Sequence, residues 1–229
     1  MTSEKINIEV QNDGFVRYED HLGDDMRVVN AARVSYKKFK ETWDDSDEKL
    51  LNFLWENEHT SPFRHSTITF TIRAPIFVLS QWMKHQVGCA WNEQSARYTE
   101  LRNGFFIPQT WRLQASKNKQ SSYGEILEPT KASEILDNVY KTVEKGYDDL
   151  LALGVCREQA RILLPVASYS ECMWTASLQA ILHFLRLRTD ENAQKEIRDY
   201  ANAVETITRQ YFPKSIILSH NTKTHIKGS

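Results

Sequence analysis

Residues 84–98 read KHQVGCAWNEQSARY and directly follow the apolar run APIFVLSQWM at 74–83. Positively charged, acidic, amide, hydroxyl, thiol and imidazole side chains are therefore crowded into one short stretch. A solvent-exposed loop would not need Trp91, and a core helix would not accept so many polar groups. We therefore expect these hydrogen-bonding side chains to converge on a bound ligand.

Further cations lie within or beside apolar segments, at positions 33, 64, 84, 97, 161, 186 and 188. A cation in such a place needs a partner. For any single one, the default interpretation is a structural ion pair with Asp or Glu. As a group they favour a phosphate-bearing ligand, because each guanidinium offers two donors to phosphate oxygens.

Several common catalytic motifs are absent from the sequence. It contains no GxGxxG, GxxxxGK[ST], HExxH or GxSxG, which argues against Rossmann, P-loop, zincin and hydrolase-elbow chemistry. The histidines are scattered, and the three cysteines (Cys89, Cys156 and Cys172) form no CxxC pair. We therefore expect no metal site.

The composition is that of an ordinary folded protein, with 229 residues, 41% of them hydrophobic and 26% charged. A net charge of −1 gives no reason to expect a nucleic-acid partner. No apolar run approaches the roughly 20 residues that span a bilayer, so we expect no membrane association. The odd cysteine count and the lack of a secretory signal predict a cytoplasmic location.

Hydrophobic periodicity predicts the elements that position the polar stretches. Alternation predicts strands at 6–10, 14–20 and 66–74, and the region 112–130 is expected to be an excursion or flexible loop. Helices are expected at 24–36, 46–58 with Ser46 as cap, after Pro75, and at 133–154, 157–164, 171–188 and 191–212. The helix at 133–154 should bury Ile135, Val139, Tyr147 and Leu150. We expect one α+β domain over 1–212, with a small, largely antiparallel sheet flanked by helices, and a flexible tail at 213–229.

The polar stretches resemble, in order and spacing, the motifs of the flavin-dependent thymidylate synthase family, also called the thymidylate synthase-complementing-protein type. The motifs are AARVS at 31–35, H-x-[ST]-P-F-x-H at 59–65, APIFV-x-x-QW at 74–82, a basic-His-basic triplet with NExSxRY at 84–98, AR-I-x-LP at 160–165 and FL-x-LR-x-D-x-x-AQ-x-EI at 184–197. The resemblance implies reductive methylation of dUMP to dTMP. It also implies 5,10-methylenetetrahydrofolate as carbon donor, FAD as hydride carrier, NADPH as reductant, and a homotetramer whose active sites are shared between subunits.

The resemblance assigns roles to individual residues. Arg188 is expected to be catalytic, facing the pyrimidine N3/O4 edge and stabilising charge as C5 attacks the one-carbon unit; the alternative is an ion pair with Asp190 or Glu191. The expected dUMP-binding residues are Gln81, Lys84, Glu93, Gln94, Ser95, Ala96, Arg97, Arg161 and Arg188. The expected FAD-binding residues are Ser35, Ser61, Lys84, His85, Gln86, Glu93, Ser177, Gln179 and His183. Ser95 is expected to bind ligand rather than act as a nucleophile, and His183 has the alternative of being a core group.

The sequence departs from the family pattern in the triplet. The usual Arg-His-Arg is Lys84-His85-Gln86, and eight residues rather than seven separate Gln86 from Ser95, so the loop 88–91 should bulge. Ser177 and Gln179 stand where many members have Asn and Arg. Cys89 is either a packing residue or a thiolate able to add to the pyrimidine ring. These departures leave open hydroxymethylation of dUMP, action on another pyrimidine nucleotide, or a non-catalytic nucleotide or flavin sensor.

Overall fold

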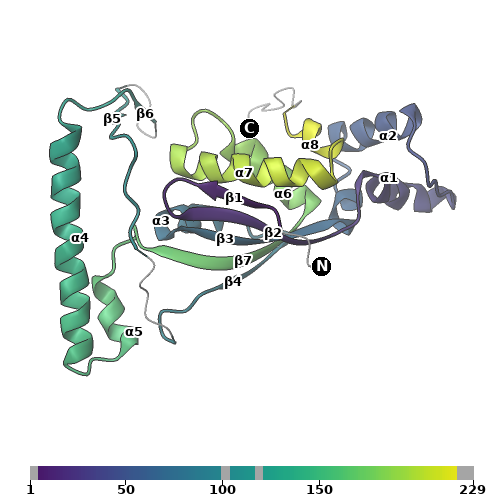
Figure 1. Cartoon of the computed structure of the whole chain (residues 1–229). Coiled ribbons are helices and arrows are strands. Elements are labelled where there is room, and N and C mark those ends of the chain that lie inside the picture. Colours follow the sequence, from purple (N-terminus) through teal and green to yellow (C-terminus); the bar gives the residue numbers. More distant parts are fainter. Residues whose placement is uncertain (1–4, 99–103, 117–120, 221–229) are drawn as a thin grey trace, which may run out of the picture.

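A five-stranded antiparallel sheet forms the centre of the molecule in a computed structural model that describes residues 5–98, 104–116 and 121–220 (Figure 1). Its strands are β1 (Asn7–Val10), β2 (Gly14–Leu22), β3 (Thr67–Pro75), β4 (Cys89–Glu93) and β7 (Tyr169–Ser177), in the order β1-β2-β3-β7-β4. Every neighbouring pair is antiparallel. The α+β class and the antiparallel sheet are thereby confirmed.

The central strand β3 follows the predicted alternation, with Ile68, Phe70 and Ile72 fully buried. Its neighbour β7 corrects the sequence analysis, which expected one helix over 171–188. Residues 169–177 are a strand, and α6 (Leu178–Arg188) begins only after Ser177, whose side chain accepts from Ala180 N. The physical signal is a change of period: Trp174 and Ala176 are buried two positions apart, whereas helical spacing starts after Ser177.

Three helices, α3 (Ile76–Trp82), α6 and α7 (Lys195–Tyr211), pack on one face of this sheet (Figure 1). The indole of Trp82 stacks on Phe184 at 4.6 Å between ring centroids, which joins α3 to α6. Tyr200 on α7 donates from its hydroxyl to Arg73 O at 3.0 Å, which joins α7 to β3. The aromatic core therefore fixes the two helices α3 and α6 against the sheet and against each other.

One end of the molecule contains α1 (Asp25–Arg33), η1 (Val34–Tyr36), α2 (Asp45–Glu56), η2 (Ser61–His65) and α8 (Ser215–Leu218). The cap of α2 is Asp44 rather than the expected Ser46, and it forms a capping box with Asp47. The helix α8 lies inside the segment expected to be a flexible tail. Asp25 accepts from Lys214 N at 2.8 Å and from Ser215 N at 2.9 Å, so the chain is packed at least to this helix.

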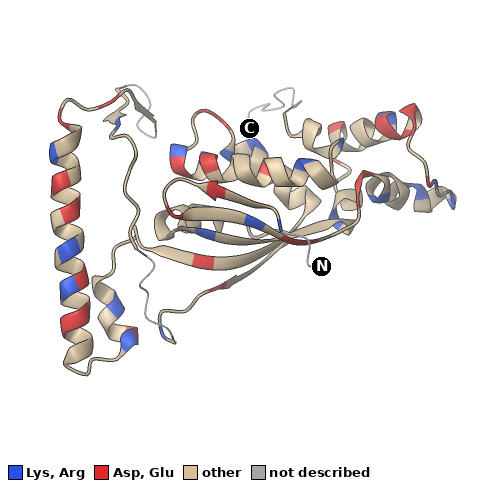
Figure 2. Cartoon of the chain, viewed as in Figure 1, with Lys and Arg blue, Asp and Glu red and all other residues tan. Residues whose placement is uncertain are grey.

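The opposite end is a limb made of β5 (Leu113–Gln114), β6 (Ser122–Tyr123), α4 (Pro129–Ala152), α5 (Arg157–Ala160) and η3 (Arg161–Leu163) (Figure 1). Acidic and basic residues are distributed along α4 (Figure 2), and no helix in the described part of the chain is long and apolar enough to cross a membrane. The prediction of which face of α4 is buried is wrong in part. Ile135 and Val139 are 61% and 51% exposed, whereas Tyr140 and Tyr147 are buried.

Candidate active site

The geometry of the sheet explains why residues from two distant helices meet. In the β3–β7 pair, Thr67 lies opposite Ser177 and Pro75 lies opposite Tyr169. The helices α3 and α6 follow directly after Pro75 and Ser177, so they start at opposite ends of the strand pair. Nine strand residues span about 30 Å, and helices of 7 and 11 residues span about 10 and 16 Å. Two such helices that run toward each other across one face bring their C-terminal ends together.

Four of the expected site residues meet at this point. Arg188 donates from Nε to His85 Nε2 at 3.1 Å and from Nη2 to the main-chain carbonyl oxygen of Gln81 at 3.5 Å. The rings of His85 and His183 are 5.8 Å apart and meet edge to face. Among the described residues no ion pair joins Arg188 to Asp190 or Glu191, so the alternative interpretation of this arginine finds no support.

The electrostatics of the cluster keep His85 neutral. Burial, and then the positive charges of Arg188 and His183, lower the pKa of His85 to about 4. A neutral imidazole leaves Nε2 free to accept from Arg188 Nε, and a protonated ring would turn that contact into a repulsion. The C-terminal ends of α3 and α6 carry partial negative charge, which favours the guanidinium at this place.

A second line of polar residues orients Gln81. Gln81 donates from Nε2 to Gln194 Oε1 at 2.6 Å, and Gln194 donates from Nε2 to Glu196 Oε2 at 2.8 Å. Glu196 is only 5% exposed and also accepts from Arg112 Nη2 at 2.7 and 3.0 Å. A carboxylate only accepts, so it fixes the orientation of the Gln194 amide, which in turn fixes that of Gln81. The side-chain oxygen Oε1 of Gln81 is thereby left as an acceptor.

The sequence analysis missed Arg112, Gln194 and Glu196 as site residues. The last two lie in the motif AQ-x-EI, which was recognised without a role for either residue. The available signal was an acidic residue directly beside Ile197, which is fully buried. Arg112 gave no signal, because it lies in a polar stretch that reads as a loop.

Other expected nucleotide ligands form a separate group near the limb. Arg97 donates from Nε to Glu158 Oε2 at 3.0 Å, and Arg161 donates from Nε to Glu158 O at 3.3 Å. Both arginines are exposed, and Ser95 Oγ accepts from Arg97 N at 3.3 Å. Glu93 is exposed at the end of β4, and Gln94 and Ala96 follow it in the chain. No hydrogen bond or ion pair between described residues joins this group to Arg188.

The residues expected at the flavin are distributed over three places. Ser35 and Ser61 line a surface hollow of about 240 Å³ together with His59 and His65. Gln179 Oε1 accepts from Arg64 Nε at 2.6 Å, while Ser177 caps α6. Lys84 and Gln86 are exposed, and His85 and His183 belong to the Arg188 cluster.

The donors around the hollow fit a flavin. Hydroxyl and imidazole groups line the hollow and can donate to the carbonyl and ring-nitrogen acceptors of such a group, while the Arg64 guanidinium, the complement of a diphosphate, belongs to the neighbouring η2 and is not part of the lining. Ser61 and Arg64 come from η2, and Ser35 comes from η1, so two adjacent short helices supply them. Among the described residues, no group of three or more His, Cys, Asp or Glu side chains could hold a metal ion.

The structure corrects the expected bulge at 88–91. Cys89–Glu93 form the regular strand β4, and a turn directly precedes it, in which Cys89 N donates to Gln86 O at 3.2 Å. Gly88 has φ +75° there, and an added Cβ would lie 2.6 Å from Ser177 Oγ, so this turn requires glycine. Burial raises the pKa of Cys89 above its ordinary value, which opposes a thiolate and favours the packing role.

Comparison with known proteins places these features in a family. Residues 18–214 match the family model described as thymidylate synthase complementing protein. A flavin-dependent thymidylate synthase of Thermosipho melanesiensis is 40% identical over 211 residues, which cover 91% of each chain. One from Thermus thermophilus is 41% identical over 208 residues, covering 91% of this chain and 76% of that protein.

A solved structure shares the fold. The UMP/dUMP methylase PolB from Streptomyces cacaoi, bound with 5-Br dUMP, has a TM-score of 0.83 and 32% identity, and the match covers 92% of this chain and 96% of that chain. The structure of PolB bound with 5-Br UMP gives a TM-score of 0.81 over the same share of this chain. The chain therefore belongs to the thymidylate synthase complementing protein family, the family of the flavin-dependent thymidylate synthases.

Proposed function

We propose that this protein catalyses the reductive methylation of dUMP to dTMP, with 5,10-methylenetetrahydrofolate as carbon donor and NADPH as reductant of bound FAD. The observation that carries the proposal is the Arg188 guanidinium, held by a neutral His85 and by the main-chain carbonyl oxygen of Gln81. A fixed cation at the N3/O4 edge of uracil stabilises the negative charge that develops when C5 attacks the one-carbon unit. When bound, the flavin supplies the hydride that reduces the ring.

The other polar groups bind and orient the nucleotide in this proposal. The acceptor Oε1 of Gln81 is directed toward the ligand, because its Nε2 is occupied by Gln194. Arg97 and Arg161 bind the phosphate, since both are exposed and each uses only its Nε for a contact with Glu158. Ser95, Gln94, Glu93 and Ala96 line the same phosphate side. Lys84 lies between the nucleotide and the flavin.

We further propose a homotetramer with active sites at subunit interfaces, in the cytoplasm. The two groups of nucleotide ligands lie apart in one chain, so a site that uses both needs a second copy. The limb also exposes apolar side chains, which is unfavourable in water: Ile135, Val139, Leu153 and Ile162 are 51% to 81% exposed. Sedimentation of the protein tests this directly, and replacement of Ile135 and Val139 by Asp should yield smaller species without activity.

The activity is tested by complementation of a thymidine-requiring cell and by mass analysis of the product from dUMP, methylenetetrahydrofolate and NADPH. The expected product carries a methyl group. Arg188→Ala should abolish it, while Arg209→Ala, which breaks only a surface pair with Glu205 on α7, should not. A hydroxymethyl product would instead establish the alternative one-carbon transfer. Flavin absorbance without NADPH oxidation in the presence of dUMP would indicate a sensor.

Methylation of UMP is the second candidate, and the likeness to PolB favours it, because PolB is a UMP/dUMP methylase. The two nucleotides differ only in the ribose 2′-hydroxyl. Turnover of an equimolar mixture of UMP and dUMP, analysed by mass, decides between the candidates. A preference for UMP would contradict our main proposal while leaving the roles of Arg188 and Gln81 unchanged.

A further inference from the structure

A hollow with no assigned role lies beside the proposed flavin site. It has a volume of about 410 Å³ and is lined by Asp24, Met26, Arg27, Asn30, Ala31, Phe39 and His65. It shares Ala31 and His65 with the smaller hollow that contains Ser35 and Ser61. Its volume is within the range of small-molecule sites. A ligand in the smaller hollow could therefore extend into this one, or meet a second ligand there.

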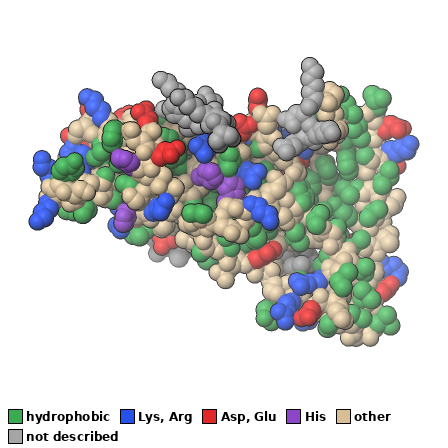
Figure 3. All heavy atoms as spheres, turned by 180° about the vertical axis from the view of Figure 1, so that it is seen from behind, with side chains coloured by type: hydrophobic (Ala, Val, Ile, Leu, Met, Phe, Trp, Pro, Cys, Tyr) green, Lys and Arg blue, Asp and Glu red, His purple; other side chains and the backbone are tan. Residues whose placement is uncertain are grey.

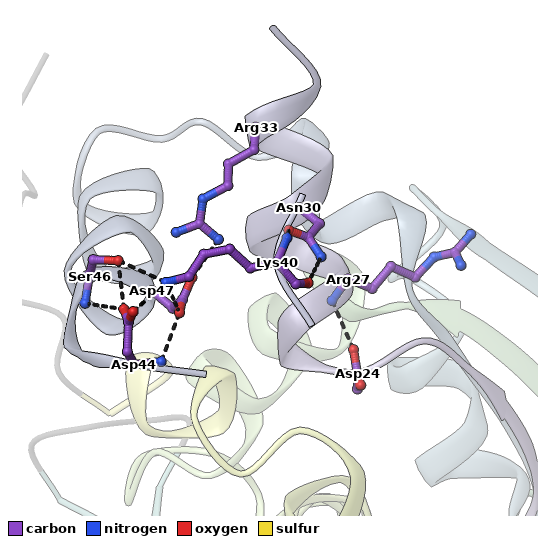
Figure 4. Close-up of polar contacts among 8 residues, drawn as sticks. All are labelled: Asp24, Arg27, Asn30, Arg33, Lys40, Asp44, Ser46 and Asp47. Atoms are coloured by element: carbon purple, nitrogen blue, oxygen red, sulfur yellow. Dashed lines mark hydrogen bonds and ion pairs between the residues drawn. The ribbon is translucent and has the colours of Figure 1, made fainter. Parts of the chain in front are cut away.

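The segment 34–40, which reads VSYKKFK, contributes Phe39 to the lining of this hollow and presents two exposed rings. Tyr36 is 77% exposed and Phe39 is 70% exposed. The segment is nevertheless anchored at its base, because the Asn30 amide donates from Nδ2 to Lys40 O at 2.8 Å and accepts from Lys40 N at 3.1 Å (Figure 4). An exposed aromatic ring on a fixed segment is a feature of a binding surface.

A buried ion-pair network holds this anchor in place (Figure 4). Asp47 is completely buried and pairs with Arg33 and, at 2.8 Å, with Lys40 Nζ. Lys40 also reaches Asp44 at 2.6 Å. The charge of Lys40 is therefore used inside the protein, and the charges that the segment offers to a ligand are those of Lys37 and Lys38.

Cationic residues lie in and next to the lining of the hollow. Lys37 and Lys38 directly precede the lining residue Phe39 in the chain, are exposed and have no ion-pair partner among the described residues. Arg27 donates from Nε to His65 O at 2.8 Å, while its two terminal nitrogens have no partner in the described ranges. Asp24 also lines the hollow, but its carboxylate accepts from Arg27 N as the cap of α1. On the molecular surface, basic, hydrophobic and His side chains lie at this end together with some acidic ones (Figure 3).

We propose that this hollow is a subsite for a planar ring that carries an anionic group, with the ring on Phe39 and the anion on Arg27, Lys37 and Lys38. A flat ring stacks on an aromatic face, and a carboxylate or phosphate is the complement of cationic side chains. The proposal rests on the proposed function, which supplies two sources of this chemistry. One is the aminobenzoyl-glutamate tail of the folate, and the other is the phosphoadenosine end of NADPH.

The test compares a double variant, Lys37→Gln with Lys38→Gln, and a single variant, Phe39→Ala, with the wild type. The matched control is Lys141→Gln with Lys145→Gln, which removes two exposed lysines from α4, far along the chain from the hollow. KM is measured for mono- and triglutamylated methylenetetrahydrofolate and for NADPH and NADH, at saturating dUMP. We expect KM for one co-substrate to rise about ten-fold in both test variants, as loss of a charge-assisted contact predicts, with the KM for dUMP unchanged.

The pattern of the change identifies the source. If the folate tail binds here, the advantage of the triglutamate over the monoglutamate disappears in the double variant. If NADPH binds here, its advantage over NADH disappears instead. Values of KM that stay within two-fold of the wild type for every co-substrate, or that change equally in the α4 control, overturn the subsite.

Direct binding separates this proposal from the proposed function. Calorimetric titration of tetrahydrofolate triglutamate and of NADPH into wild-type and variant protein needs no turnover. Weaker binding in the double variant, in a protein that methylates no pyrimidine nucleotide, would refute the function and support the subsite. Equal binding of both ligands by all variants, in a protein that makes dTMP, would refute the subsite and support the proposed function.

Discussion

Replacement of Glu196 by Gln should affect nucleotide binding although Glu196 contacts no proposed ligand directly. The wild-type carboxylate accepts from Arg112 and Gln194 through short contacts of 2.7 to 3.0 Å. An amide of the same volume has no charge, one oxygen and one NH2 group, so the charge-assisted bond to Arg112 is weakened, and the NH2 faces the Gln194 donor unless the Gln194 amide turns. A buried charge-assisted hydrogen bond contributes about 1.5–3 kcal/mol, and we expect the free energy of unfolding to fall by about 2–3 kcal/mol, since Glu196 is 5% exposed.

The functional effect follows from the direction of the hydrogen bonds. Without an acceptor-only group at position 196, the Gln194 amide is free to turn and offer its NH2 to Gln81. Gln81 then accepts from Gln194 and presents a donor where the ligand meets an acceptor in the wild type. Loss of one oriented hydrogen bond corresponds to about 1–3 kcal/mol, and hence to a fall of about 5- to 150-fold in kcat/KM for the nucleotide.

Steady-state kinetics with dUMP and urea unfolding measure the two effects separately. Gln194→Met, which keeps the volume and removes both hydrogen bonds, should lower kcat/KM as much as Glu196→Gln does. The double variant should be no worse than either single variant, because all three break the same relay. Glu205→Gln, on the same helix, is the control. An unstable Glu196→Gln with an unchanged KM, or a fully active Gln194→Met, would refute the reasoning.

Three further outcomes are expected. In NMR, His85 should titrate near pH 4, and its pKa should rise in Arg188→Gln but stay below the usual range, because burial is the larger cause. The contribution of neutral His85 to the free energy of unfolding should be complete above about pH 6.5. It should be lost as the pH falls toward 4, since only the unfolded chain binds the proton between these values. Cys89→Ser should retain turnover with dUMP, as the raised pKa of this thiol predicts; loss of turnover would reinstate the nucleophile. Asp25→Asn should lower the free energy of unfolding in urea by about 2 kcal/mol, because its amide NH2 would face either Lys214 N or Ser215 N, which bond to different oxygens of Asp25; an unchanged midpoint would contradict this.

Strands with one buried face could be predicted from the sequence, because alternation is a local signal. The same periodicity misled at β7, where Trp174, Leu178, Ile181 and Leu185 also fit a helical stripe if the strand and the helix are read as one. The strand became recognisable only from its neighbours, since Trp174 packs between Phe70 and Trp91 from two other strands. Local sequence does not contain that information.

The roles expected for the site residues stay predictions, but the structure shows which of these residues lie close together. The motif residues Gln81, His85, His183 and Arg188 are near one another, as the resemblance implied. The separation of Arg97 and Arg161 from them depends on where the limb lies, which the sequence does not reveal. The exposed side of α4 was mispredicted because an apolar stripe indicates burial without indicating whether the covering surface belongs to the same chain.

The head-on approach of α3 and α6 limits where the chain can change in length. One residue added to or removed from β3, α3, β7 or α6 would displace Gln81 or Arg188 by 1.5 to 3.4 Å and rotate it about 100° around a helix or to the other face of a strand. Alignments with related chains should therefore place gaps outside 67–82 and 169–188. The extra residue between Gln86 and Ser95, relative to the usual family motif, agrees with this expectation. The lengths of these two spans set the positions of Gln81 and Arg188, so we expect changes in chain length only in the segments outside them.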